Sequence, residues 1–144
     1  MPDSESLVRL TQEFFSKHWG IEDSSPQWDF SWDWCGPVPN YLVGGVYALL
    51  KGNEVLYVGL GNSRGGGIYQ DRGISRRLMA HVTLSSPKGS PVDSVLRERW
   101  IKVGIDKIAT IGFPQQYNYL APALEDFLIG HLGPVENKVK RRNT

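Results

Sequence analysis

Cysteine is nearly absent from this sequence: Cys35 is the single one among 144 residues. Therefore no internal disulfide can form, and a cysteine-rich zinc site is excluded. No apolar run approaches the ~20 residues that a membrane-spanning helix needs, and the first residues lack the basic-then-apolar pattern of a signal peptide. We therefore expect a soluble, intracellular protein of the cytoplasm with no membrane partner.

A large excess of one charge is also missing, since the net charge is +1. This argues against a strongly basic nucleic-acid binder, but the charge is unevenly distributed. Residues 1–60 hold three Lys/Arg and eight Asp/Glu, whereas residues 61–144 hold thirteen and seven. A phosphate-facing surface would produce such an asymmetry, and so would an ordinary solvated surface. With 40% hydrophobic residues, the chain is long and apolar enough to bury a globular core.

The centre of the chain has the pattern of a tight β-hairpin. Residues 43–50 form an apolar run with β-branched residues, 51–54 have the composition of a turn, and 55–58 are β-rich again. Tyr47 and Tyr57 occupy comparable places in the two predicted strands. Because strand tyrosines often pack against a sheet face, this pair alone does not indicate a function.

Further elements are predicted on either side of the hairpin. Hydrophobic periodicity and end signals predict helices at 4–18, from 73, within 92–103 and at 120–131, and a strand at 107–112. Residues 28–34 alternate aromatic and small polar residues, which predicts an extended segment with one aromatic face. Trp28, Trp32 and Trp34 would either stack on bases or cover a sheet.

Five short motifs together resemble the GIY-YIG nuclease superfamily. They are Gly45-Val46-Tyr47, Tyr57-Val58-Gly59, residues 73–78 with His81, Leu124-Glu125, and residues 134–137 ending in Asn137. The resemblance covers about residues 43–140. It implies an α/β fold, a small domain over 43–144 with a three-stranded antiparallel sheet flanked by helices. Residues 1–42 would add an N-terminal helix and aromatic extension packed on this core.

The resemblance also assigns catalytic roles. In the superfamily the first tyrosine, here Tyr47, is a candidate for deprotonating the attacking water, and the second, Tyr57, helps to order the site. The ordinary tyrosine pKa is about 10, so a base at neutral pH needs positive charge or hydrogen bonds nearby. Arg77 and a metal ion would supply these, and Arg77 would also brace the phosphate and stabilise its developing charge. His81, on the same side of the helix, would support the base; Arg76 is the competing arginine.

Glu125 is the metal ligand that the resemblance implies, for one Mg²⁺ or Mn²⁺ ion per site. A carboxylate flanked by Leu124 and Leu128 is costly to bury unless it is paired or bound to a cation, and Mg²⁺ takes few protein carboxylates. Asp126 is equally available, but the twelve-residue step to Asn137 favours Glu125. Asn137 would anchor a phosphate or fix the site, or simply cap a turn.

Basic residues outside this centre are candidates for contacts to the DNA backbone: Arg64, Arg72, Arg76, Lys138 and Arg141. The C-terminal basic tail that holds the last two would otherwise be a solvated end. The glycine-rich loop at 59–67 lacks the Gly-Lys-Ser/Thr ending of a P-loop, so no nucleotide cofactor is expected. Leu60 stands where some members of the superfamily carry a lysine. Residues 67–69 spell Gly-Ile-Tyr literally, but no pair of predicted strands follows them, so Tyr69 is predicted to lie in a loop.

The predicted activity is that of a metal-dependent endonuclease, which hydrolyses DNA phosphodiester bonds through a tyrosine-activated water. Since one such site cuts one strand, double-strand cleavage would require a homodimer or sequential nicking. One alternative is a catalytically silent module that binds nucleic acid or proteins. A carboxylate-based glycosidase would need two converging acids, and only Glu125 has support here.

Overall fold

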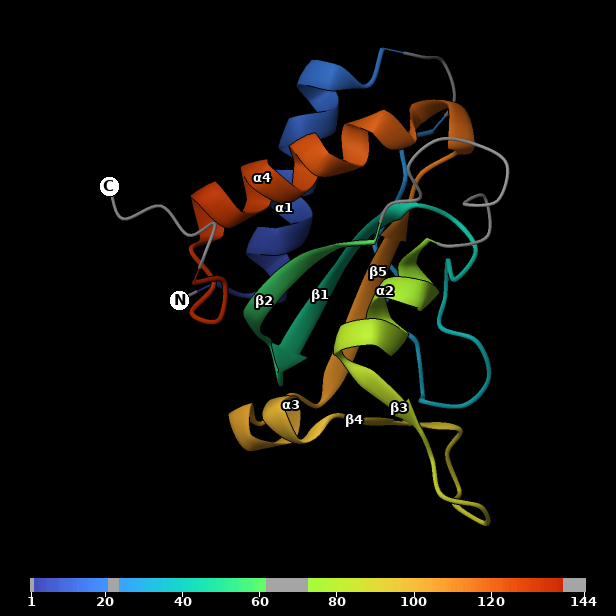
Figure 1. Cartoon of the computed structure of the whole chain (residues 1–144). Helices are drawn as coiled ribbons and strands as arrows, with labels where there is room; N and C mark the ends of the chain where they lie inside the picture. Colours follow the sequence, from blue (N-terminus) through green and yellow to red (C-terminus); the bar gives the residue numbers. More distant parts are fainter. Residues whose placement is uncertain (1, 21–23, 62–72, 139–144) are drawn as a thin grey trace.

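The fold is built on a three-stranded antiparallel sheet (Figure 1). The computed structural model describes residues 2–20, 24–61 and 73–138. The central strand β1 (Gly45–Lys51) pairs with β2 (Glu54–Gly61) through the predicted hairpin and with β5 (Lys107–Gly112) on its other side. The predicted α/β domain with a three-stranded antiparallel sheet and flanking helices is therefore confirmed.

Two helices cover one face of the sheet. These are α1 (Ser4–His18) and α4 (Ala121–Leu132), which pack on each other and on β1 and β2. Because side chains alternate along a strand, Val46, Ala48 and Leu50 point to this face and join the apolar residues of both helices. α4 begins with proline in its first turn and ends at Gly133, whose φ of 58° is left-handed, as the sequence predicts.

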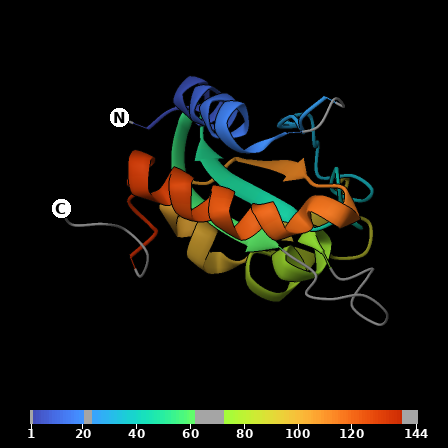
Figure 2. The same ribbon diagram turned by 90° about the horizontal axis from the view of Figure 1, so that it is seen from above.

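The opposite face is covered by shorter elements. They are α2 (Ile74–His81), α3 (Glu98–Val103) and a small hairpin of β3 (Thr83–Ser85) and β4 (Ser94–Leu96). Tyr47 and Leu49 of β1 point to this side and pack with Trp100 of α3 in a second apolar cluster. Figure 2 shows α1 on one side of the sheet and α2 and α3 on the other.

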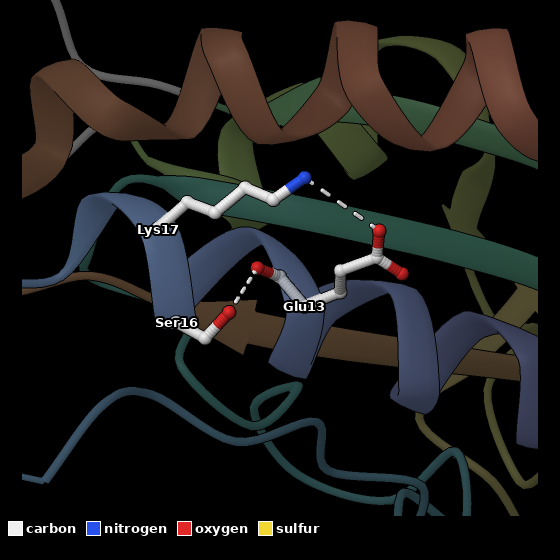
Figure 3. A network of polar contacts seen from close by, with 3 residues as sticks. All are labelled: Glu13, Ser16 and Lys17. Carbon is white, nitrogen blue, oxygen red and sulfur yellow. Dashed lines mark hydrogen bonds and ion pairs between the residues drawn. The ribbon is translucent and has the colours of Figure 1, made fainter.

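The solvent-facing side of α1 carries polar contacts (Figure 3). Lys17 lies 3.7 Å from Glu13, and the Ser16 hydroxyl donates a hydrogen bond to the Glu13 carbonyl. Asp3 caps the helix by accepting a hydrogen bond from the Ser6 amide. An exposed ion pair contributes little to stability, so α1 is held mainly by its buried face. Within the described residues, no helix is long and apolar enough to cross a membrane.

The prediction of a helix within 92–103 is wrong for its first part. Ser94–Leu96 form β4, and the helix is confined to Glu98–Val103. The amides of Asp93 and Ser94 donate hydrogen bonds to the carbonyl of Trp34, far away in the sequence. Contacts between distant segments therefore override the local pattern.

The aromatic segment at 28–34 is also not a strand with one aromatic face. Its backbone joins the sheet only through an isolated bridge between Asp29 and Thr110. Trp28 and Phe30 pack on the α1–α4 side, whereas Trp32 and Trp34 pack on the opposite cluster. The chain thus passes from one side of the sheet to the other, and Trp34 adopts a left-handed φ of 72°.

Candidate active site

Tyr47 lies at the centre of the candidate site. Only 1% of its surface is exposed, and its register partner on β2 is Gly59. A Cβ atom built on Gly59 would lie 2.3 Å from Cζ and 2.5 Å from the hydroxyl oxygen of Tyr47. The tyrosine ring therefore crosses β2 at this position, and only glycine leaves room for it. This contact links the two predicted tripeptide motifs physically.

Tyr57 lies on the same face, two residues before Gly59. Its ring centroid is 6.1 Å from that of Tyr47 and 5.1 Å from that of Trp100, which is buried in α3. We call Tyr47, Tyr57 and Trp100 the aromatic row. Tyr57, the middle member of the row, is half-buried, so part of its side chain is open to solvent.

Arg77 connects helix α2 to Tyr47. The charge and the polar side chain of Arg77 both lower the pKa of the Tyr47 hydroxyl. The contact falls on the arginine that the superfamily pattern favours over Arg76. His81, one turn further along α2, is exposed, and its pKa is lowered by burial and then by the charges of Arg77 and Arg97. The structure therefore brings Arg77 and His81 to the same end of the site.

Three glycines place α2 this close to the strands. A Cβ on Gly73 would lie 1.9 Å from the carbonyl oxygen of Val43, and one on Gly61 would lie 2.7 Å from the Cα of Ile74. A Cβ on Gly45 would lie 2.0 Å from the carbonyl oxygen of Ile111 and 2.9 Å from the Ile74 side chain. The first turn of α2 consequently rests directly on the ends of β1 and β2, and Arg77 follows one turn later.

Glu125 is buried in α4, with 5% of its surface exposed, whereas its neighbour Asp126 is exposed. Its negative charge raises the pKa of Tyr47, so the carboxylate acts on the same hydroxyl as Arg77. In the described part of the chain, no group of three or more His, Cys, Asp or Glu residues could hold a metal. A single carboxylate fits a cation such as Mg²⁺ that keeps most of its waters, and does not fit an all-protein cage.

The pKa of the Tyr47 hydroxyl is set by burial and by its neighbours Tyr57, Arg77 and Glu125. Burial is the largest influence and raises its pKa, and Tyr57 raises it further. The charge and hydrogen bond of Arg77 lower it, but the net direction is upward. The hydroxyl therefore keeps its proton at neutral pH, and Arg77 alone does not supply enough positive charge to change this.

Asn137 is buried behind the edge of β2. Its Oδ1 accepts a hydrogen bond of 2.8 Å from the Val58 amide, and its Nδ2 donates one of 2.7 Å to the Val58 carbonyl. The Glu136 amide also donates to the carbonyl of Leu56. Both ends of the Asn137 amide are thus engaged by the strand that carries Tyr57, and the side chain holds this strand in place.

Other candidates lie away from the aromatic row or outside the described residues. Arg64, Arg72, Arg141 and Tyr69 lie outside them, whereas Arg76 and Lys138 are described and exposed. A pocket of about 430 Å³ lies between α1 and the β1–β2 turn, and none of the predicted catalytic residues lines it.

Sequence reasoning did not find Trp100. This side chain packs on Tyr57, and its indole Nε1 donates a hydrogen bond of 3.1 Å to the His81 carbonyl. It therefore ties α3 to the strand and to the helix that carry the other site residues. An aromatic residue in a short amphipathic segment gives no local signal for such a role.

Tyr47, Tyr57, Arg77 and Glu125, which come from four elements, interact at one place, with His81 and Asn137 around them. Comparison of the chain with protein-family models, curated proteins and solved structures gives no match.

Proposed function

We propose that this protein is a GIY-YIG-type endonuclease that hydrolyses phosphodiester bonds of DNA with a divalent cation. One observation carries the proposal. An arginine from α2 and a carboxylate from α4 act on the same buried tyrosine hydroxyl of β1. Such convergence of opposite charges on one titratable group is typical of sites that perform acid–base chemistry.

The phosphate would be bound at the open side of the aromatic row. Arg77 is exposed and carries a planar guanidinium, which can bind two phosphate oxygens and stabilise the charge that develops during hydrolysis. The half-buried Tyr57 would donate a hydrogen bond to the same phosphate. Trp100, packed against the Tyr57 ring, keeps this hydroxyl in position.

Proton transfer would involve Tyr47 and His81. Burial and the charges of Arg77 and Arg97 lower the pKa of His81, which favours the neutral imidazole that can accept a proton. Tyr47 becomes a base only when added positive charge offsets its burial. A divalent cation held at Glu125 would supply that charge and polarise the phosphate. Asn137 fixes β2 and with it the distance between the two tyrosines.

The test is nicking of supercoiled plasmid by the purified protein with Mg²⁺ or Mn²⁺. Tyr47→Phe should lower the nicking rate by about 10²-fold or more, the usual contribution of an acid–base group. Glu125→Gln removes the carboxylate that would hold the cation, so metal-dependent nicking should be lost. Tyr119→Phe and Asp126→Asn are matched controls at exposed positions and should nick like the wild type. Circular dichroism of every variant would show that the fold is retained.

A silent nucleic-acid-binding module is the second candidate, and the raised pKa of Tyr47 is the observation that favours it. The plasmid experiment separates the two functions. Retarded mobility of DNA without any metal-dependent nicking would favour the binding module. If a panel of duplex, branched and single-stranded DNA is neither cut nor bound, the nuclease proposal is wrong.

A further inference from the structure

Helix α3 places two arginines beside the candidate site. Arg97 precedes the helix and Arg99 lies in its first turn, next to Trp100. The Arg97 amide donates a hydrogen bond of 2.8 Å to the Val82 carbonyl, and its Nη2 donates one of 2.6 Å to the Met79 carbonyl. Both acceptors belong to the C-terminal end of α2, so these bonds anchor the start of α3 to the end of α2.

Arg99 is exposed and is held by an aromatic ring. Its guanidinium carbon lies 4.4 Å from the centroid of the Trp100 ring, which is a cation–π contact. Trp100 in turn packs on Tyr57. The aromatic row therefore leads from the Tyr47 hydroxyl to the charge of Arg99, and this arrangement fixes a flexible side chain near the site.

The acidic residue nearest to Arg97 and Arg99 in the sequence pairs with a different cation. Glu98 lies 3.6 Å from Lys102, one turn along α3. Within residues 2–20, 24–61 and 73–138, neither Arg97 nor Arg99 takes part in an ion pair. The influence of Arg97 on the pKa of His81 places its charge close to the helix that carries Arg77. The hydrogen bond from Arg97 to the Met79 carbonyl thus holds its positive charge against α2, the helix that carries Arg77.

We propose that Arg97 and Arg99 form a second phosphate-binding surface, which holds the backbone of the nucleic-acid strand next to the bond that is cut. This inference rests on the proposed function, because it takes the substrate of the site to be nucleic acid. Each strand of DNA carries one phosphate per ~3.4 Å of helix axis. The ring-to-ring distances of 6.1 and 5.1 Å therefore keep Trp100, and with it Arg99, within the length of a few phosphates from Tyr47.

The experiment measures binding of a fluorescent DNA duplex without divalent cations over a range of salt concentrations. Arg99→Gln should weaken binding about fivefold at low salt, the upper range for one exposed charge pair. It should also reduce the slope of log K against log salt by about 1, as for the loss of one phosphate contact. Arg99→Lys keeps the charge, so it should retain the slope while losing part of the affinity.

Lys17→Gln is the matched control, since this lysine is exposed on α1, on the other side of the sheet. It should leave both affinity and slope unchanged. If Arg99→Gln behaves like Lys17→Gln while the wild-type protein still nicks plasmid, the second surface is wrong and the nuclease proposal stands. If the wild-type protein neither binds nor cuts DNA, both are wrong. Thermal unfolding of each variant shows that the fold is retained.

Discussion

The two faces of the central sheet share the strand β1 but differ in what they bury. Toward α1 and α4 the buried side chains are aliphatic residues and phenylalanines, with Val46 of β1 and Leu128 of α4 among them. Toward α2 and α3 the buried side chains include Tyr47 and Trp100, which carry polar groups, and Tyr57 packs against them. Alternate residues of one strand thus serve stability on one side and candidate chemistry on the other. Glu125 is the exception, because it comes from α4 and yet acts on Tyr47.

The helices of the two faces also differ in how they are held. α1 and α4 have 15 and 12 residues, whereas α2 and α3 have eight and six. Helices this short are marginal on their own. α2 depends on close glycine contacts with the strands, and α3 on Trp100. Local, specific contacts therefore position the side that carries the candidate site, whereas the other side relies on buried area.

The largest effect on stability is expected from the apolar face. Leu128→Ala removes a fully buried side chain and should lower the free energy of unfolding by about 2–5 kcal/mol. The nicking rate per folded molecule should stay unchanged, because Leu128 does not belong to the aromatic-row cluster. Urea denaturation measures the first quantity and a plasmid assay at low temperature the second. Val135→Ala, at a position 48% exposed, is the control.

An effect on the site itself is expected from Gly59→Ala. The added Cβ would lie 2.3 Å from Cζ of Tyr47, so the ring must move away from Arg77. Overpacking of this kind costs about 1–3 kcal/mol of stability, and a misplaced catalytic group costs about 10²-fold in rate. Nicking assays and urea denaturation measure both. Gly20→Ala, where no atom lies within 4 Å, should behave as wild type. Full activity of Gly59→Ala would contradict the role given to the ring.

The smallest effect concerns alkaline pH. Burial raises the pKa of Tyr47, so the folded protein keeps this proton while an unfolded tyrosine ionises near pH 10. The stability from this group is complete below pH 10 and declines above it, by at most about 1.4 kcal/mol per pH unit. Between pH 9 and 11, a range that brackets this ordinary pKa, Tyr47→Phe should therefore lose less stability than the wild type does. Tyr119→Phe, at a position 67% exposed, should match the wild type in the same urea titrations.

The sequence predicts the parts of the fold that local patterns determine. The hairpin, the helix after Asp3 and the helix that ends at Gly133 all follow from periodicity and turn chemistry. The hairpin of β3 and β4 and the path of the aromatic segment do not, because they depend on bonds between segments far apart, such as those to the Trp34 carbonyl. Short strands without such partners have little preference of their own.

The candidate site shows the same division. Motif spacing selects Tyr47, Tyr57, Arg77 and Glu125, and in the fold the other three all influence the pKa of Tyr47. Their catalytic roles stay predictions. The sign of the Tyr47 pKa shift could not be predicted, because it depends on how completely the ring is buried. Trp100 was missed for a similar reason, since its importance comes from the neighbours that the fold gives it.

Asn137 has a further consequence for how the chain avoids association with other chains. The backbone of a sheet edge is a template for strand pairing. Here Asn137 and Glu136 form hydrogen bonds with outward-facing backbone groups of β2. Asp29 does the same with the backbone amide and carbonyl of Thr110 in β5. Asn137 follows Val58 by 79 positions. During synthesis on the ribosome, the edge of β2 therefore stays uncovered for several seconds until Asn137 has been added. A chain interrupted in that interval would be at risk of aggregation through this edge.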